Sequence, residues 1–160
     1  MARFDTTGMQ DLINEMQQMG QNGGDVARVM TLAAADEIAQ SWRESIREHG
    51  FVKTGAMLDS VGFPKGAQQM GGMYYADIYP QGKDSTGTRN AEKAFILNYG
   101  SSRLKPTYWT DEADARAETK VTERLSAIWG DFLETGIVPP APVIPARGKK
   151  QSGVRTERKK

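Results

Sequence analysis

Clustered carboxylates are the first groups in the sequence that could do chemistry. Four acids fall within eight consecutive residues: Asp111, Glu112, Asp114 and Glu118. Carboxylate oxygens are suitable ligands for hard divalent cations. Two bases, Arg116 and Lys120, alternate with these acids, which is typical of the solvated face of a helix. We therefore expect neither a metal site nor a cofactor at these positions.

Nucleophilic chemistry is restricted by two residue types. The chain has no cysteine, and His49 is the single histidine. The lack of cysteine excludes disulfides, a thiol nucleophile and Cys-based zinc or iron–sulfur sites. A catalytic triad would depend on His49 alone, and the sequence contains no phosphate-binding loop, dinucleotide fingerprint or nucleophile elbow. We therefore expect the protein to act by binding rather than by catalysis.

Charge is distributed unevenly along the chain. The segment Ala146–Lys160 has one acid and seven bases, a net charge of +6: Arg147, Lys149, Lys150, Arg155, Arg158, Lys159 and Lys160. Because the whole chain carries +1, the preceding 145 residues carry −5. A basic segment of this kind contacts nucleic-acid phosphates or an acidic protein surface, or it is a solvated tail without a partner. Composition alone leaves these alternatives open.

Hydrophobic periodicity predicts the long helices. Apolar residues at helical spacing predict a first helix over Met9–Met19, followed by a loop at 21–24. A second helix is predicted from Asp25, as its N-cap, to His49, whose imidazole suits the end of the helix dipole. A third is predicted from Thr110 or Asp111 to Glu134, with Trp129 and Leu133 widening an apolar stripe of six residues: Ala113, Ala117, Val121, Leu125, Ile128 and Phe132.

The middle of the chain predicts short strands and turns. Thr54 is the expected cap of a short helix, and Val61–Phe63 the start of a strand. Residues 65–72 predict a loop, and Met73–Tyr79, ended by Pro80, predicts a strand with Tyr74, Ala76 and Ile78 on one face. Residues 81–88 predict a loop that orders on a partner. Residues 91–99 fit a helix capped by Asn90 and ended by Gly100, or else a strand.

The end of the sequence changes character after Gly136. Residues 137–145 contain four of the seven prolines and predict an extended chain. We therefore expect an α+β domain over residues 1–137, with three main helices packed on a small antiparallel sheet. An extended arm, proline-rich and then basic, follows over 138–160. No run of about 18 apolar residues occurs, so no membrane span is expected.

Four segments occur in an informative order: TGAMLDSV (54–61), DIYPQG (77–82), RNAEKAFILNYGSS (89–102) and KPTYWTDEAD (105–114). Their order and spacing resemble the gene-product-ten-like tail-component family of HK-type long-tailed bacteriophages, over roughly Met9 to Glu134. Ser101 stands where the family usually has threonine, which keeps the hydroxyl. The arm beyond Gly136 is not required by the family pattern.

The resemblance implies a virion protein of the head–tail junction, a neck or tail-completion protein assembled in the host cytoplasm. It implies a homo-oligomeric ring, of six copies or of twelve, between a head-side connector and the tail terminator or tail tube. Seven residues are expected to fix turns of the fold: Thr54, Gly55, Tyr99, Gly100, Ser101, Pro106 and Trp109. Three are expected to contact a partner: Lys83, Asp84 and Arg89.

Two questions stay open at this level. The basic residues of the arm contact either DNA in the central channel or the acidic body of a neighbouring subunit. The alternative functions are a nucleic-acid-associated phage protein that acts through its basic arm, and an enzyme or enzyme inhibitor encoded by a prophage. No membrane partner is expected.

Overall fold

The computed structural model describes residues 7–143, with side chains from Asn14 onward. The helices are α1 (Thr7–Glu48), α2 (Ala56–Ser60), α3 (Asn90–Tyr99) and α4 (Trp109–Thr135), and the strands are β1 (Val61–Gly62), β2 (Gln68–Met70), β3 (Met73–Tyr75) and β4 (Tyr79–Pro80). The expected mixture of helices and antiparallel strands is confirmed. The described strands form two separate pairs, β1 with β4 and β2 with β3, rather than one sheet.

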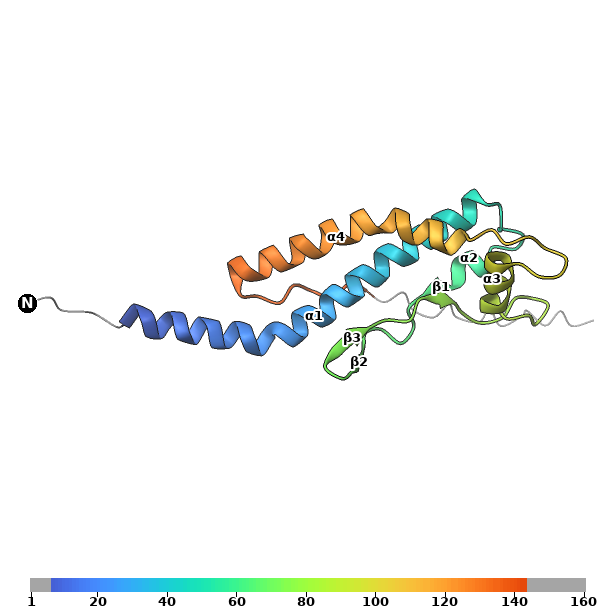
Figure 1. Cartoon of the computed structure of the whole chain (residues 1–160). Coiled ribbons are helices and arrows are strands. Elements are labelled where there is room, and N and C mark those ends of the chain that lie inside the picture. Colours follow the sequence, from blue (N-terminus) through green and yellow to red (C-terminus); the bar gives the residue numbers. More distant parts are fainter. Residues whose placement is uncertain (1–6, 144–160) are drawn as a thin grey trace, which may run out of the picture.

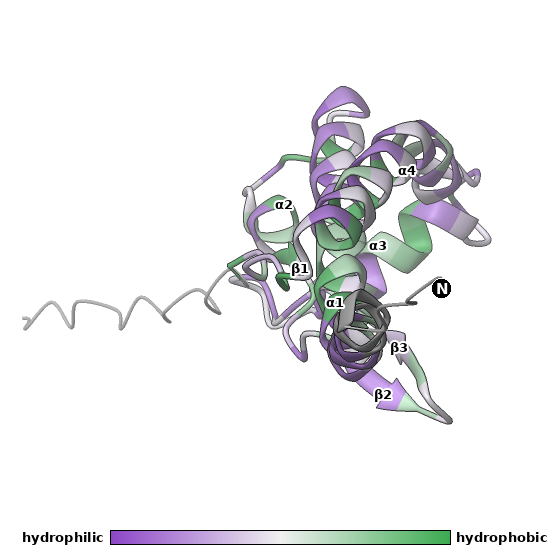
Figure 2. Ribbon diagram, turned by 90° about the vertical axis from the view of Figure 1, so that its left-hand side faces the viewer, coloured by the Kyte–Doolittle hydropathy of each residue, from purple (hydrophilic) through white to green (hydrophobic). Residues whose placement is uncertain are grey.

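The body is built on α1 and α4, which lie side by side and run in opposite directions (Figures 1 and 2). The predicted stripe of α4 faces α1: Ala113, Ala117 and Phe132 are buried, and the other three members are half-buried. The buried residues of α1 are mostly small or branched: Val26, Val29, Leu32, Ala33, Ala35, Ala39 and Ile46. Small side chains let the two backbones approach closely, so this face supplies much of the hydrophobic stabilisation.

Polar contacts fix the register of the two long helices. The buried Ser41 hydroxyl donates to the carbonyl of Ala113 at 2.7 Å. Arg124 donates to the carboxylates of Asp36 at 3.1 Å and Glu37 at 2.7 Å. A partly buried arginine that contacts two carboxylates is restricted in position, so these bonds oppose sliding of α4 along α1.

The first helix differs from its prediction. Residues 21–24 do not form a loop, and Asp25 is not an N-cap, because α1 is continuous from Thr7 to Glu48. Glycine lowers helix stability by only about 1 kcal/mol per residue relative to alanine, which does not stop a helix held by packing on its C-terminal side. Asn22 donates to the carbonyl of Gly136 at 3.5 Å. Thr7–Gln21 therefore extends beyond the end of α4 (Figure 1).

The predicted strand Met73–Tyr79 is divided. Residues 76–78 are not in a strand; β3 pairs with β2 in a hairpin, and β4 pairs with β1. The expected loop at 65–72 therefore contains β2, and Pro80 lies in β4 opposite Val61 rather than ending a strand. Positions 74, 76 and 78 are less exposed than 73, 75 and 77, as the alternation predicts, but Tyr79, expected on the outer face, is half-buried because it lies in β4. The hairpin projects from the body (Figure 2).

The helix alternative for residues 91–99 is confirmed, and Gly100 ends α3. Asn90 is not a cap: it lies inside α3, is buried, and donates to the carbonyls of Ala56 at 3.2 Å and Gln81 at 2.7 Å. Thr54 makes no capping hydrogen bond either, because Gly55 is the residue that precedes α2. The amide of Asn90 thus ties α3 to the first turn of α2 and to the loop after β4.

The α3–α4 junction lies against α1. Trp109 is 0% exposed, and its indole nitrogen is 3.4 Å from the carbonyl oxygen of Ala94. The Ser45 hydroxyl donates to the Trp109 carbonyl at 3.1 Å, and the ring of Trp42 meets the Trp109 ring edge-on with centroids 5.3 Å apart. One side chain therefore connects α1, α3 and α4.

The chain reverses direction at Gly136, the C-cap of α4, and the helix ends at Thr135, one residue beyond its predicted end at Glu134 (Figure 1). Residues 137–143 form neither helix nor strand. The remainder of the expected arm, including all seven of its bases, lies outside the described residues. Within the described part of the chain, no helix is both long and apolar enough to cross a membrane.

Gly100 provides a test of the α3–α4 junction. A Cβ at this position would lie 2.6 Å from the carbonyl oxygen of Leu104 and 2.8 Å from the nitrogen of Pro106, and its φ is +79°. We expect Gly100→Ala to lower the free energy of unfolding by about 2–4 kcal/mol, from the left-handed φ plus the overlap. Urea denaturation measures this value.

Gly71→Ala is the matched control, because Gly71 also has a positive φ of +59° but has open space around it. It should lower the free energy of unfolding by only about 1 kcal/mol, from the backbone conformation alone. Equal losses for the two variants would contradict the packing described for Gly100.

Candidate functional site

The loop that carries the predicted contact residues Lys83, Asp84 and Arg89 is built around one carboxylate. One oxygen of Asp84 accepts hydrogen bonds from the backbone amides of Thr86 at 2.9 Å and Thr88 at 3.0 Å. Its other oxygen accepts from the ammonium group of Lys93 on α3. The side chain of Asp84 is only 3% exposed. Asp84 is therefore an internal organiser of the loop, and its expected contact with a partner stays a prediction.

These contacts also change the acidity of Asp84. The Lys93 ammonium, followed by the hydroxyl and amide donors of Thr86 and Thr88, holds the pKa of Asp84 well below its usual value of 3.8. The carboxylate is thus charged at every physiological pH. Lys83 and Arg89 pair across the mouth of the loop through their backbones, and their side chains are exposed.

A second group of predicted residues meets in the turn after α3. Ser101 and Leu104 bond to each other through their backbones, and the backbone of Thr107 bonds to the carbonyl of Leu97 at 3.2 Å. Gly100 packs against Pro106 inside this turn. Thr54 and Gly55 belong to a different turn, ahead of α2. Trp109 is buried and Gly55 and Gly100 are half-buried, whereas Thr54, Tyr99, Ser101 and Pro106 are exposed. That these seven residues fix turns of the fold stays a prediction.

Sequence reasoning missed the apolar surface around that turn. Five large side chains of α3 and the following loop are exposed: Phe95, Ile96, Tyr99, Leu104 and Tyr108. Phe95 and Tyr99 contact each other, with ring centroids 4.9 Å apart. The signal in the sequence is that apolar residues occur on every side of the 91–99 helix, so one side packs inward at Ala94 while the other remains outside.

The C-terminal end of α4 is a second exposed apolar surface. Trp129 and Leu133, which widen the apolar face of α4, are 45% and 52% exposed. Among the described residues, α1 packs beside this part of α4 and covers the side that carries Phe132, which leaves the opposite side exposed. Ile137 just after the helix is 69% exposed.

Two carboxylates near the start of α4 contact different residues in or just after α1 rather than each other. Asp114 accepts from the indole nitrogen of Trp42 at 2.6 Å, and Glu112 lies 3.5 Å from the Nε2 atom of His49. The Nδ1 atom of His49 is 3.0 Å from the carbonyl oxygen of Ser45, and its ring stacks on Phe51. Among the described residues, no three Asp, Glu or His side chains are placed to hold a metal ion.

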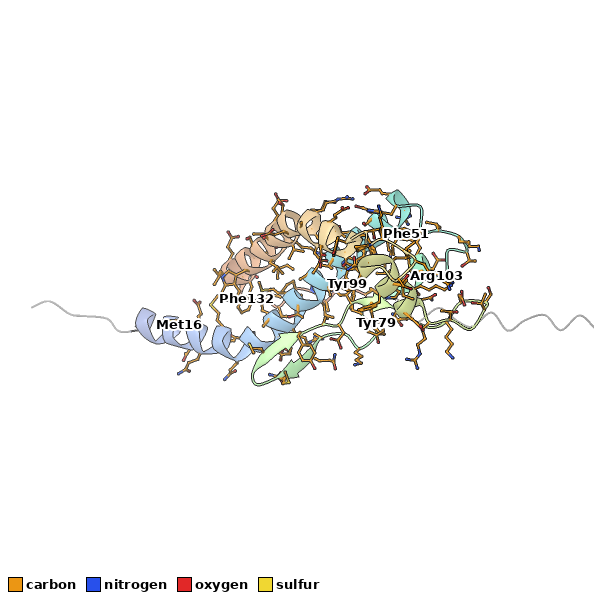
Figure 3. All side chains as sticks on the ribbon, turned by 45° about the vertical axis from the view of Figure 1, so that its right-hand side comes forward. Met16, Phe51, Tyr79, Tyr99, Arg103 and Phe132 are labelled. Carbon is orange, nitrogen blue, oxygen red and sulfur yellow. The ribbon has the colours of Figure 1, made fainter. Side chains whose placement is uncertain are left out.

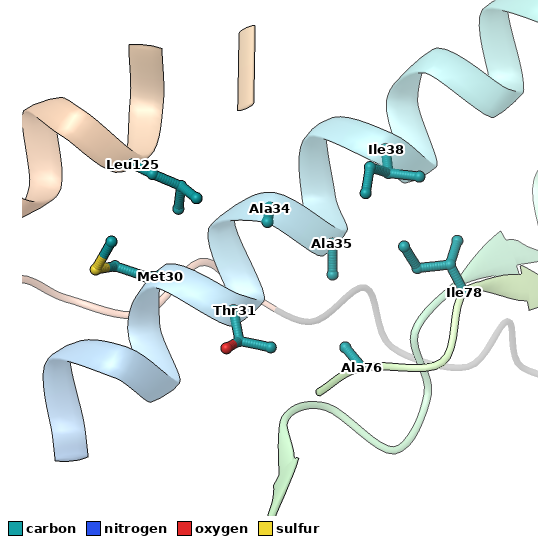
Figure 4. Close-up of a pocket in the computed structure, with 8 residues that line it drawn as sticks. All are labelled: Met30, Thr31, Ala34, Ala35, Ile38, Ala76, Ile78 and Leu125. Atoms are coloured by element: carbon teal, nitrogen blue, oxygen red, sulfur yellow. The ribbon is translucent and has the colours of Figure 1, made fainter. Parts of the chain in front are cut away.

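An apolar cavity of about 270 Å³ lies between α1, the 76–78 segment and α4 (Figure 4). It is lined by Met30, Thr31, Ala34, Ala35, Ile38, Ala76, Ile78 and Leu125. The only side-chain polar atom of this lining, the Thr31 hydroxyl, donates to the carbonyl of Ala27 at 2.9 Å. The cavity thus offers no acid, base or nucleophile, and it suits only apolar groups.

Comparison with known proteins gives no match: no family model fits the chain, and no curated protein or solved structure is significantly similar to it.

Asp84 predicts a specific dependence of stability on pH. Because its pKa is lower in the folded chain than in the unfolded chain, its contribution to stability is complete above 3.8 and is lost as the pH falls toward the folded value. We expect Asp84→Asn to lower the thermal midpoint at neutral pH and to flatten the loss of stability in acid. Thermal melts followed by calorimetry or spectroscopy, from neutral pH down to below pH 3.8, measure both effects.

Asp77→Asn is the control, because Asp77 is an exposed acid that pairs with Lys65 at 3.4 Å, and such pairs contribute little. If the thermal midpoints of Asp84→Asn and of the unmodified chain fall in parallel as the pH is lowered, the Asp84 contacts do not stabilise the fold.

Proposed function

We propose that this chain is a structural subunit of the head–tail junction of a long-tailed bacteriophage. In this role it forms a ring that joins the head-side connector to the tail terminator or tail tube. The function is binding, and it requires no cofactor. The chain is assembled into the virion in the host cytoplasm.

The observation that carries the proposal is that the four segments of the family resemblance form one hydrogen-bonded unit. The amide of Gln81 donates to the carbonyl of Ser60 at 2.9 Å, which joins the first two segments. Asn90 donates to the carbonyl of Gln81 at 2.7 Å, which joins the second and third. Thr107 donates to the carbonyl of Leu97 at 3.2 Å, which joins the third and fourth. A family fold defined by these four segments requires that they pack together in this way.

The projecting part of α1 supports a role in an assembly. Asn14–Gln18 are all exposed, and Met16 is 64% exposed (Figure 3). A single helical segment of about 15 residues is marginally stable in water without packing. Its sequence carries the methionine-rich apolar pattern that predicted an amphipathic helix, and flexible methionines adapt to a partner surface. A neighbouring subunit or tail protein is the partner that this segment fits.

A second candidate is a nucleic-acid-associated protein that acts through its basic arm. The net charge of +6 over Ala146–Lys160 favours it, because clustered lysine and arginine bind phosphates without reading sequence. In the neck proposal the same bases face DNA in the channel or an acidic neighbour.

Electron microscopy of a phage with an early stop codon in this gene tests the proposal. We expect lysates that contain DNA-filled heads beside separate, finished tails, because each half assembles but the joint is missing. Supplying the intact chain from a plasmid should restore joined virions. Normal joined virions in the absence of the chain would contradict the neck role and leave nucleic-acid binding as the leading candidate.

A further inference from the structure

The acidic end of the molecule combines charge with exposed apolar area. We define it as the last turns of α4 and the residue after them: Trp129, Asp131, Leu133, Glu134 and Ile137. From Leu125 to Val143 the sequence has these two acids and no base. The three apolar side chains are 45–69% exposed.

Electrostatics at this end are unfavourable in a single chain. The C-terminus of a helix carries partial negative charge, so cations there stabilise it and acids destabilise it, by about 0.3–1 kcal/mol each. The last turn of α4 contains no basic residue, and both acids lie in the final five residues of the helix. A cationic partner would remove this repulsion.

The basic loop has the complementary composition. We define it as the exposed residues of the α3–α4 connection: Tyr99, Arg103, Leu104, Lys105 and Tyr108. From Asn98 to Thr110 the sequence has two bases and no acid. Backbone bonds between Ser101 and Leu104, and from Tyr108 to the Asn98 carbonyl, hold the loop in one shape. Tyr108 has a left-handed φ of +51° and is 51% exposed, so its ring is held outward at some cost in backbone strain.

The two surfaces lie at opposite ends of α4 and cannot meet within one chain. The basic loop directly precedes α4, and the acidic end closes it, about 40 Å away along a helix of 27 residues. Figure 3 shows Arg103 toward one end of the molecule and Phe132, beside the acidic end, toward the other. We propose that the basic loop of one copy docks on the acidic end of the next copy, as the repeating contact of the assembly.

A second copy fits the acidic end better than the basic arm does. The segment 146–160 supplies seven cations but only one large apolar residue, Val154, so its composition matches the acids of this end but not the apolar area of Trp129 and Leu133. The basic loop supplies two cations together with two tyrosines and a leucine. Burial of such side chains, with charge at the rim, is the usual composition of a specific interface.

The contact joins two different patches, so it is heterologous and repeats from copy to copy until it closes into a ring or continues as a filament. That the assembly closes into a ring, rather than continuing as a filament, rests on the proposed function. The contact itself depends only on the two surfaces.

Charge reversal tests the contact in the full chain. We expect the unmodified chain to self-associate in sedimentation experiments. Arg103→Glu with Lys105→Glu, and separately Asp131→Lys with Glu134→Lys, should each weaken association by more than about tenfold, because like charges then face each other. Mixing the two variants should restore association, since each reversed surface then meets a complementary one.

Two features keep the result interpretable. Lysines at positions 131 and 134 favour the C-terminus of α4, so loss of association in that variant does not come from unfolding. Glu118→Lys with Glu123→Lys makes the same change of charge on exposed positions in the middle of α4, and it should leave association unchanged.

Three results would overturn the inference. One is an unmodified chain that stays monomeric. Another is a mixture of variants that fails to associate. The third is weakening by the 131/134 variant without weakening by the 103/105 variant, which would indicate another cation source such as the basic arm. The stop-codon phage experiment is independent of this test. Separate heads and tails, together with charge variants that associate normally, would keep the neck role and reject this interface. Joined virions, together with the expected rescue by mixing the charge variants, would keep this interface and reject the neck role.

Discussion

Burial of the Trp109 side chain is the constraint on which the arrangement of the helices depends. It is the first residue of α4 and is fully buried between α3 and α1. The Ser45 hydroxyl bonds to its carbonyl, and Asn98 accepts from the amide of Thr110 at 3.0 Å, so the start of α4 is fixed from both neighbours. A large aromatic side chain buries much apolar area, and its N–H needs a partner when it is buried; Trp109 meets both conditions at this junction.

The same constraint produces the outward surfaces. Because α3 ends at Tyr99 and α4 must begin at Trp109, the chain has to turn between the two helices within residues 100–108. Gly100 admits the close approach of Leu104 and Pro106, and the side chains of residues 101–106 are exposed, whereas the Thr107 hydroxyl donates back to the Leu97 carbonyl. Once its start is fixed, α4 runs antiparallel to α1 and carries its acidic C-terminus to the far end of the molecule (Figure 1). An exposed apolar surface at each end of α4 is thus a consequence of one buried tryptophan.

The sequence predicts the parts of this arrangement that depend on local pattern. The stripe from Ala113 to Phe132 places α4 correctly, and Gly100 correctly ends α3. The continuity of α1 was missed because glycine lowers helix propensity without forbidding the helical conformation. The division of Met73–Tyr79 depends on pairing with β1 and β2, which are distant in sequence. Periodicity identifies an apolar face but not whether another element covers it, so the exposure of Tyr108, Trp129 and Leu133 had no reliable signal.

The central claim is that the molecule is one unit of a head-to-tail assembly, and the lack of cysteine in the chain allows a direct measurement. Lys105→Cys and Asp131→Cys place one thiol on each surface, and a bis-maleimide linker joins thiols that lie close together. The account predicts no cross-link for either single variant, dimers when the two are mixed, and a ladder with a largest species for the double variant. Dimers from a single variant alone, or no ladder from the double variant, would contradict a head-to-tail contact.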